Sequence, residues 1–502
     1  MRRTQHLIGL ACAALVLLFT VCHRWLETPL WSFNGSRLMP SFALARGVNY
    51  YVLSPPGGPL YNSLYGPLVA VVYLPATLFR SPNSAVLAGA AITVLLCFSA
   101  AAFLHFAPFG AGRGPVDTLA FITAGFLMCY LEPLKYSCFN IHADGSGLAF
   151  GAVACGALYS RGPRQWRAAL PLSALCAVFS IFCKQTFLPV PVALLVYLWV
   201  AEGSARAVRY LYWLIAAAAL AAGGAMYVAG PANLYHCLLW VPAHHPWNDA
   251  SHIVSAIQAM RSFIRVSMPV PVLLVACAVY LWIGGWTSGR LRGPELGALA
   301  ANRCVPLLLV GVALLPFSIM GRAKAGGDVN SLSFSLFFLT CGLTVMLADV
   351  SRGAQSGSPR RVAAPVMAAI LIVLAISEAP LAMDIRASVR RLPQAPQQVA
   401  FDYLKRHPGG AYFPWFPLSH YDAEHQFRHY AFGIVDRLMA GEAVSKAEFL
   451  AYVPTDPKVI AFAADGTREL FGYDLLKYLP EYRFQVNDPD LPGWLVYGKV
   501  PR

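Results

Sequence analysis

His142 and Asp144 are the residues of this chain best suited to acid–base chemistry, because they stand together at the start of the apolar run GSGLAFGAVACGAL. A carboxylate at such a position can take a proton from an acceptor hydroxyl or hold a divalent cation. An Asp just before a helix also commonly does no more than accept hydrogen bonds from free backbone N–H groups. The sequence leaves both interpretations open, and the first predicts a reactive site at the end of a helix.

Two cations interrupt apolar sequence and are suited to binding an anion. Arg37 lies in NGSRLMPSFALARG, and its planar guanidinium fits a phosphate group through two parallel hydrogen bonds. Lys184 lies between two apolar half-runs in FSIFCKQTFLPVP, where an ammonium needs a partner such as a phosphate oxygen. In a membrane protein, either side chain also has a simpler explanation, which is that it reaches out to the lipid headgroups.

A glycine-rich segment, GRAKAGGDVN at Gly321–Asn330, combines two cations with backbone that can approach an anion closely. Arg322 and Lys324 supply the charge, and Asp328 and Asn330 are expected to cap the helix that follows. The spacing is not that of an ATP-binding P-loop. The alternative is a flexible loop that is merely solvated.

Composition places these residues in a polytopic α-helical membrane protein. The 502 residues are 57% hydrophobic and 12% charged, whereas soluble domains carry about 25% charged residues. Several apolar runs approach the length of about 20 residues that a helix needs to cross a bilayer. About eleven transmembrane helices are predicted, at residues 6–22, 84–105, 117–131, 145–160, 168–183, 186–201, 209–229, 268–286, 304–320, 331–349 and 363–382.

Arginines at the loop ends predict the orientation of these helices. With the N-terminus inside, each of five short inner loops carries Arg, which is the positive-inside pattern. The number of spans is odd, so the C-terminus is expected outside. The outer face then carries the first outer loop, residues 23–83, and the connections at 132–144, 230–266 and 321–330.

The first outer loop is too long for a turn and too apolar for a solvated linker. Pro and Gly interrupt it every few residues, so it is expected to form short interfacial helices instead of one span. At Tyr65 the sequence YGP turns the chain back towards the membrane. We expect Tyr65, His142, Asp328 and Asn330 to line a substrate cavity on the outer face.

After Met383 the composition becomes that of a soluble module. From Met383 onward the chain holds 14 Lys and Arg against 14 Asp and Glu, so the net charge of +14 belongs to the membrane part. That placement argues against a nucleic-acid partner. The prediction is a transmembrane domain, 1–382, and a small extracytoplasmic α/β domain, 383–502. Helices are expected at 396–407 and 466–479, and strands at 411–415, 459–463, 483–486 and 494–497.

The order of these features resembles the GT-C class of integral membrane glycosyltransferases, which includes the protein mannosyltransferases and the aminoarabinose transferase. The matching segments are LARGVNYY, GPLYNSLYGPLVAVVYLPATLF, NIHADGSGLAFGAVACGAL, FCKQTFL and GRAKAGGDVNSLSFSLFFL, followed by the outer tail. The resemblance implies an enzyme that takes a sugar from a polyprenyl-phosphate donor. Transfer to a glycan, lipid or protein acceptor of the cell envelope would occur on the extracytoplasmic face, with inversion at the sugar carbon.

The resemblance also implies roles for individual residues. In the family, an acid in the first outer loop serves as the base, and a second acid lies in the next outer loop, where Asp144 resembles it. The first acid is missing, because NGS precedes Arg37 and the only acid in the loop is Glu27. Glu27 or Asp144 is therefore the expected catalytic residue. The cations expected to hold the donor phosphate are Arg37, Lys184, Arg322 and Lys324.

Two other functions stay open on the sequence alone. A lipid-carrier flippase or transporter would place charges near the middle of the membrane, whereas here they gather at helix ends. A catalytically inactive scaffold for envelope assembly would account for the missing acid. In each case the chain is expected to be a multi-pass protein of the bacterial inner (plasma) membrane, in contact with membrane lipids. The sequence implies no certain cofactor and leaves a divalent cation open.

Overall fold

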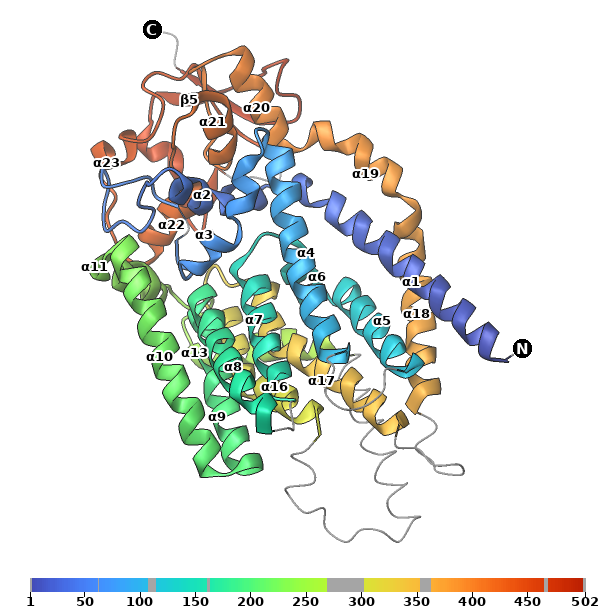
Figure 1. Ribbon diagram of the computed structural model, residues 1–502. Coiled ribbons are helices and arrows are strands. Elements are labelled where there is room, and N and C mark those ends of the chain that lie inside the picture. The colour runs from blue at the N-terminus through green and yellow to red at the C-terminus, as the bar shows by residue number, and fades with distance from the viewer. Residues whose placement is uncertain are drawn as a thin grey trace.

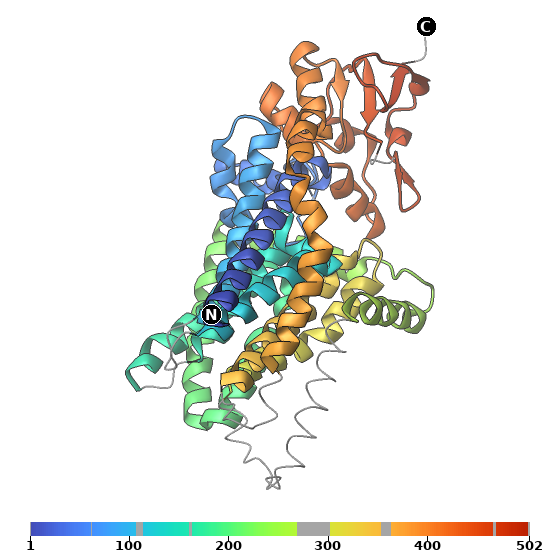
Figure 2. The same cartoon turned by 90° about the vertical axis from the view of Figure 1, so that its right-hand side faces the viewer.

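The computed structural model describes residues 2–61, 63–106, 114–159, 163–268, 302–352, 363–464 and 468–499. Most of the long helices form one bundle. At one end of this bundle, the C-terminal segment from α20 (Pro396–Arg406) onward lies beside α2 (Phe33–Ala45) and α3 (Leu68–Val72), as Figures 1 and 2 show. This end of the molecule carries the residues that sequence analysis singled out.

The helices of the bundle follow the apolar runs of the sequence. Six of the described helices are long and apolar enough to cross a membrane, and two bent pairs raise the number to eight if each pair is one span. The bounds of the bundle helices are α1 (Arg2–Leu26), α4 (Pro82–Phe106), α5 (Pro115–Tyr130), α6 (Glu132–Phe139), α7 (Ala143–Ala157), α8 (Pro163–Cys183), α9 (Pro189–Glu202), α10 (Ser204–Ala229), α16 (Cys304–Ala323), α17 (Ser333–Arg352) and α18 (Ala363–Met383).

Shorter helical segments join these helices or cover their ends. They are η1 (Thr28–Leu30), η2 (Leu74–Leu78), η3 (Gln185–Phe187), α11 (Pro231–Tyr235), η4 (His236–Trp240), α12 (Val241–His244), α13 (His252–Ser267), η5 (Val329–Leu332), α19 (Ile385–Arg391) and η7 (Leu392–Gln394).

The predicted spans agree with the described helices where the apolar run is long. Those at 84–105, 209–229 and 304–320 each fall within a single helix. After α5 the chain bends by 95° into α6, because Pro133 favours the start of a new helix over continuation of the old one. The predicted span at 268–286 lies outside the described residues, apart from Met268. The number of eleven spans and the inside position of the N-terminus stay predictions.

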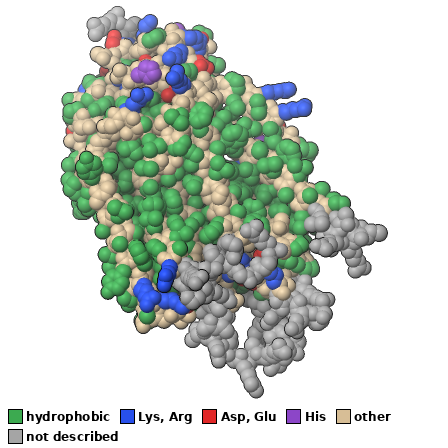
Figure 3. All heavy atoms as spheres, viewed as in Figure 1, with side chains coloured by type: hydrophobic (Ala, Val, Ile, Leu, Met, Phe, Trp, Pro, Cys, Tyr) green, Lys and Arg blue, Asp and Glu red, His purple; other side chains and the backbone are tan. Residues whose placement is uncertain are grey.

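The surface of the bundle is that of a protein surrounded by lipid. Hydrophobic side chains cover the middle of the molecule as a broad band, and charged side chains gather towards its two ends (Figure 3). On α10, Leu220 is 75% exposed and Tyr227 is 92% exposed. Apolar exposure on this scale, over helices of spanning length, matches the hydrocarbon core of a bilayer. The chain is a multi-pass integral membrane protein.

A cluster of charged side chains joins three helix ends at the opposite end of the bundle. Arg303 Nη2 lies 2.6 Å from Asp349 Oδ1 and 3.5 Å from Asp117 Oδ1, and Arg352 Nη2 lies 3.3 Å from the same Asp117 oxygen. Asp117 is buried. Because a buried charge is costly unless it is paired, this cluster holds the start of α5, the start of α16 and the end of α17 together.

The first outer loop folds into the predicted short helices, but it is covered by the chain itself. Leu38, Met39 and Ala43 of α2 are wholly buried, and Phe42 packs against Tyr421 with ring centroids 5.3 Å apart. A Cβ added to Gly433 would stand 2.6 Å from the backbone of residues 60 and 61. The loop is therefore packed between the bundle and the C-terminal segment.

The C-terminal segment contains a four-stranded sheet with the order β1-β2-β6-β5. Strands β1 and β2 are parallel, and the other neighbours are antiparallel. The strands are β1 (Ala411–Tyr412), β2 (Val459–Phe462), β5 (Tyr482–Val486) and β6 (Leu495–Lys499), and the accompanying helices after α20 are α21 (Pro417–Glu424), α22 (Ala431–Met439) and α23 (Lys446–Leu450).

The helix predicted at 466–479 is wrong. The described part of this stretch forms a hairpin of β3 (Glu469–Leu470) and β4 (Tyr473–Asp474), followed by the short 3₁₀ helix η8 (Leu475–Tyr478). Phe471 and Gly472 have φ angles of 50° and 79°. Two successive positive φ angles make the tight turn of a hairpin and cannot occur inside an α-helix.

Candidate active site

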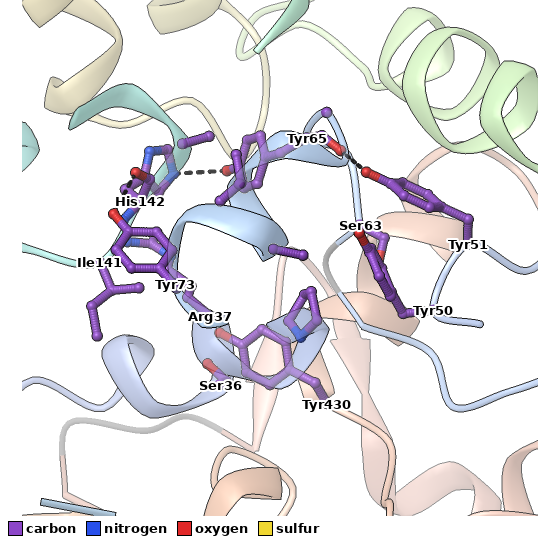
Figure 4. Close-up of a pocket in the computed structure, with 15 residues that line it drawn as sticks. Ser36, Arg37, Tyr50, Tyr51, Ser63, Tyr65, Tyr73, Ile141, His142 and Tyr430 are labelled. Carbon is purple, nitrogen blue, oxygen red and sulfur yellow. Dashed lines mark hydrogen bonds between the residues drawn. The ribbon is translucent and has the colours of Figure 1, made fainter. Parts of the chain in front are cut away.

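A cavity lies where the first outer loop, the start of α7 and the residue preceding α22 meet (Figure 4). Its empty volume is about 460 Å³, part of which is open to the exterior. Arg37 is its one permanently charged side chain, and no carboxylate is found among its described lining residues. The aromatic and polar side chains that line it are Ser36, Arg37, Tyr50, Tyr51, Ser63, Tyr65, Tyr73, His142 and Tyr430.

Asp144, in the first turn of α7, is wholly buried and does not itself line the cavity. Its Oδ1 accepts a hydrogen bond from Lys184 Nζ at 2.7 Å, and its Oδ2 accepts one from Asn330 Nδ2 at 2.6 Å. His142 Nδ1 lies 2.8 Å from Oδ2, and the Ser137 hydroxyl donates to the same oxygen at 3.5 Å. Asp144 thereby joins segments from four parts of the chain and is saturated with donors.

The electrostatic surroundings keep Asp144 ionised. Burial alone would raise the pKa of Asp144, but His142 and the Lys184 ammonium hold it below its usual range. Burial lowers the pKa of Lys184, and the Asp144 carboxylate opposes that effect. The two groups form a buried ion pair, and removal of one partner from such a pair costs about 3–5 kcal/mol of folding free energy.

His142 connects Asp144 to the cavity. Its Nδ1 faces the Asp144 carboxylate, and its Nε2 lies 2.8 Å from the hydroxyl oxygen of Tyr65. Burial lowers the pKa of His142 to about 3, with the nearby carboxylate opposing that shift only in part, so the imidazole is neutral at neutral pH. The backbone N–H of Asp144 also points at Nδ1, at 3.3 Å, but the carboxylate oxygen is closer. A lone pair on Nδ1 would face that ionised oxygen at 2.8 Å, so we assign the single ring proton to Nδ1, which leaves Nε2 as an acceptor.

Tyr65 is partly exposed and contacts the far side of the His142 ring from Asp144. Its hydroxyl donates to His142 Nε2, and the Lys184 ammonium lies 5.2 Å from the centre of its ring. The Tyr51 hydroxyl donates to the backbone carbonyl of Tyr65. Burial raises the pKa of the Tyr65 hydroxyl, so the phenol keeps its proton at neutral pH.

Arg37, on α2, forms no ion pair within the part of the chain that the structure describes. Its Nη2 donates to the Tyr136 hydroxyl at 2.9 Å, while the buried Nη1 has no hydrogen-bond partner among the described residues. The guanidinium carbon lies 4.8 Å from the ring centre of Trp31 and 5.6 Å from that of Phe33. These rings hold the guanidinium in place and leave one nitrogen available to a ligand.

Glu27 does not join this group of residues. Its Oε1 accepts a hydrogen bond from Arg391 Nη2 at 2.8 Å, at the end of α1. Asn34, three residues before Arg37, makes structural hydrogen bonds where the family's acid was expected. Its Nδ2 donates to the carbonyl of Thr28 at 2.8 Å and to Asn140 Oδ1 at 2.9 Å. An acid at position 34 could make neither bond.

Of the segment at 321–330, only Asn330 reaches the group of residues around Asp144. Asn330 reaches Asp144, whereas Asp328 is exposed and accepts a hydrogen bond from the backbone N–H of Val329 as the cap of η5. Arg322 Nη1 donates to the carbonyl of Gly327 at 2.7 Å. Lys324 Nζ donates to the carbonyls of residues 242 and 243 at 2.8 and 3.1 Å. Neither cation is among the residues that line the cavity.

Tyr136 and Tyr430 were not among the site residues predicted from the sequence. Tyr136 lies in the connection at 132–144 that was already expected on the outer face, so its position was a usable signal. Tyr430 precedes α22 in the C-terminal segment, and only the tertiary fold brings it to the cavity. No local pattern marks it.

The donor set does not fit a divalent cation. Asp144 is the one carboxylate in the cluster around Lys184, and a metal ion there would have to displace the ammonium group. No group of three or more His, Cys, Asp and Glu side chains arranged to hold a metal occurs among the described residues.

Two crystal structures of ArnT from Cupriavidus metallidurans match the fold along the chain. The structure bound to undecaprenyl phosphate has a TM-score of 0.54 at 12% identity and covers 98% of each chain. The apo structure has a TM-score of 0.52 at 13% identity and covers 100% of this chain and 99% of ArnT. Arabinosyltransferase EmbB from Mycobacterium smegmatis matches at a TM-score of 0.36 and 13% identity, over 78% of this chain and 43% of its own. No family model and no curated protein matches the sequence.

At such low identity the likeness to ArnT concerns the fold. It extends over the apolar bundle and over the C-terminal segment, since nearly every residue of both chains is covered. The chain has the GT-C-like fold of membrane glycosyltransferases.

Proposed function

We propose that the protein is a membrane glycosyltransferase that moves a sugar from a polyprenyl-phosphate donor to a cell-envelope acceptor, on the extracytoplasmic face of a bacterial inner membrane. The observation that carries this proposal is the state of Arg37. Its guanidinium lines a cavity at one end of an apolar bundle, and its buried Nη1 has no partner among the described residues.

A phosphate group fits this environment. A buried donor without a partner costs free energy, and a phosphate oxygen would satisfy it through a charge-assisted hydrogen bond. A polyprenyl phosphate is an anion on a long apolar tail, so its site must join a cation to a surface that lipid can reach. The ArnT structure with undecaprenyl phosphate shows that the same fold accommodates such a molecule, which supports the proposal.

Arg37 would also favour the chemical step. When the bond between sugar and phosphate breaks, negative charge grows on the leaving phosphate, and a fixed cation stabilises that charge. The other three candidate cations already have partners: Lys184 neutralises Asp144, while Arg322 and Lys324 donate to backbone carbonyls. We therefore assign the donor phosphate to Arg37.

Neither expected acid is placed to act directly as the base. Asp144 is behind the cavity lining with both oxygens occupied, and Glu27 is paired with Arg391. We propose that Asp144 positions the groups around it, and that the residue that receives the proton is one of those that line the cavity.

We further propose that the cavity faces away from the cytoplasm. Arg206 lies in the first turn of α10, Arg303 precedes α16 and Arg352 ends α17. These helix ends lie at the end of the bundle away from the cavity (Figure 1). Arg at that end fits the cytoplasmic side. A reporter enzyme that is active only outside the cytoplasm, fused after residue 502, should be active. An inactive reporter would contradict this orientation.

The proposed function is tested by comparing lipid-linked sugars and envelope glycans of cells with and without the gene. Deletion should cause one lipid-linked monosaccharide to accumulate and one glycan modification to disappear. Wild-type protein should reverse both changes, and Arg37→Ala should reverse neither while reaching the membrane in normal amounts. Arg391→Ala, which removes an exposed arginine outside the cavity, is the matched control and should restore both.

The same comparison separates the alternatives. If the protein were a flippase, its deletion would leave the lipid-linked sugar on the wrong side of the membrane. Inverted vesicles from deletion and wild-type cells would then differ in transport of this lipid and not in transfer of its sugar. If the protein were a scaffold, the Arg37→Ala variant would still support normal envelope glycans. Either result would overturn the proposal.

A further inference from the structure

A line of close polar contacts runs from the buried Asp144 through His142 to the cavity. His142 Nδ1 lies 2.8 Å from Asp144 Oδ2. On the other side of the ring, His142 Nε2 lies 2.8 Å from the Tyr65 hydroxyl oxygen (Figure 4). Exposure increases along the line: Asp144 is 0% exposed, His142 is 2% exposed, and Tyr65 is partly exposed. Tyr65 is therefore the point at which this line meets a ligand.

The protons along this line have a defined direction. With the ring proton assigned to Nδ1, beside the ionised Asp144 carboxylate, the lone pair on Nε2 accepts from the Tyr65 hydroxyl. The Tyr65 oxygen then has lone pairs left over, and these can accept a hydrogen bond from a ligand in the cavity. The line is thus arranged to carry a proton away from the cavity.

We propose that Tyr65 and His142 form a proton relay that takes over the task of the missing acid, and that the acceptor is a neutral hydroxyl. This proposal rests on the proposed glycosyl transfer. An acceptor that was already an anion would need no base, whereas a hydroxyl must lose its proton as it attacks. The relay therefore identifies the acceptor as an alcohol group of a sugar or lipid.

The acceptor oxygen forms a bond to the sugar carbon while the bond from that carbon to the phosphate oxygen breaks, and the leaving phosphate keeps the electron pair beside Arg37. The acceptor proton passes to the Tyr65 oxygen as the Tyr65 proton passes to His142 Nε2. The resulting imidazolium is stabilised by the Asp144 carboxylate. A water later removes the proton from His142 and regenerates the neutral imidazole.

The surroundings hold the relay in place. Lys184 donates to Asp144 and lies against the ring of Tyr65, and Asn330 donates to the same carboxylate. The hydroxyl of Tyr73 lies 3.1 Å from the carbonyl of His142. Asp144, Lys184 and Asn330 are accordingly positioning residues, while Tyr65 and His142 are the proposed catalytic residues.

Two single variants and their combination test the relay. Tyr65→Phe removes one oxygen and keeps the ring against Lys184, and His142→Gln removes the proton acceptor. The assay measures consumption of lipid-linked sugar extracted from the deletion strain by purified protein in vesicles. Each variant should be slower by about 10²–10⁴-fold, the usual range for acid–base catalysis. The double variant should be no slower than the slower single, because the two residues act as one unit.

Two further readouts separate catalysis from folding. Both variants should still be stabilised by undecaprenyl phosphate in a thermal shift assay, because Arg37 is unchanged. Their residual rate should rise with pH, since hydroxide replaces the relay, while the wild-type rate stays level from about pH 6 to 8. Tyr210→Phe, which removes a buried hydroxyl near the start of α10 that accepts a hydrogen bond from Ser173, is the control and should keep the wild-type rate.

The outcomes distinguish the relay from the proposed function. An active wild type with a Tyr65→Phe variant within threefold of its rate would overturn the relay alone. Strictly additive losses in the double variant would also overturn it. A wild type that consumes no lipid-linked sugar would overturn the proposed function, and the relay with it.

Discussion

At the scale of single residues, Asn34 explains why the expected acid of the first outer loop is absent. Its amide donates two hydrogen bonds, to the carbonyl of Thr28 and to Asn140, and its oxygen accepts one from the backbone N–H of Ile141 at 2.9 Å. It ties α2 to the entrance of α7. A carboxylate at this position would face two acceptors and would break that tie.

Asn34→Asp should therefore destabilise the protein without creating a better enzyme. We expect a loss of about 1–3 kcal/mol of folding free energy, the usual cost of leaving buried polar groups unpartnered, together with a lower transfer rate. Thermal unfolding in detergent and the vesicle assay measure the two effects. Asn487→Asp, at an exposed position of the C-terminal segment, is the control with little expected change. Unchanged stability with faster transfer would show that an acid at 34 can act as the base.

The buried state of His142 predicts how stability depends on pH. Burial lowers its pKa from 6.5 to about 3, so the folded protein resists protonation that the unfolded chain accepts. Such a group stabilises the fold above its ordinary pKa, and this contribution is lost as the pH falls. Between about pH 6.5 and 4.5 the loss from His142 amounts to about 2–3 kcal/mol.

His142→Gln should accordingly flatten the acid side of the stability curve, measured by thermal unfolding at a series of pH values. Asp144 keeps Lys184 and Asn330 as donors in the variant, and the titrating groups outside this cluster are unchanged. The difference between the curves above about pH 4.5 therefore reports His142. The lowered pKa of Asp144 acts in the same direction but only below about pH 4. Parallel curves for wild type and variant between pH 6.5 and 4.5 would contradict a buried neutral imidazole.

At the scale of elements, the apolar runs predicted the long helices well because the bilayer demands both length and apolarity. The bend after α5 and the hairpin at 469–474 were not predicted, since each depends on one or two residues: Pro133 in the first case, Phe471 and Gly472 in the second. Short elements owe their form to such local backbone preferences and to packing, and hydropathy is insensitive to both.

The contact between the loop at Gly66 and the end of α8 can be tested directly. The backbone N–H of Gly66 donates to the carbonyl of Cys183 at 2.9 Å, and a Cβ at Gly66 would stand 1.9 Å from the carbonyl oxygen of Phe182. Gly66→Ala should push the loop that carries Tyr65 away from the end of α8. We expect a loss of about 1–3 kcal/mol of stability and a larger loss of transfer rate.

The control for Gly66→Ala is Gly223→Ala on α10, where nothing lies within 4 Å of an added Cβ. It should leave stability and rate unchanged or slightly raise stability, because alanine favours a helix. Melting temperature and transfer rate of the two variants are measured side by side. A Gly66→Ala protein that behaves like the control would show that the loop is not held tightly against α8.

At the scale of the whole molecule, the cavity is a product of the tertiary fold. Arg37, His142 and Tyr430 come from the first outer loop, the start of α7 and the C-terminal segment. The sequence identified the first two from their chemistry and the apolar context. It did not identify Tyr430, nor the pairing of Lys184 with Asp144 that removes Lys184 from the list of phosphate ligands, because both depend on contacts between distant segments.

The most direct test of the central claim is transfer by the purified protein in vesicles that contain the lipid-linked sugars of the deletion strain. The wild type should deplete one lipid-linked monosaccharide and release an equal amount of polyprenyl phosphate. Arg37→Ala should leave that lipid intact, at a melting temperature close to that of the wild type. If the wild type leaves the lipid-linked monosaccharide unchanged, the protein is not the proposed transferase. If Arg37→Ala consumes that lipid at the wild-type rate, Arg37 does not hold the donor phosphate.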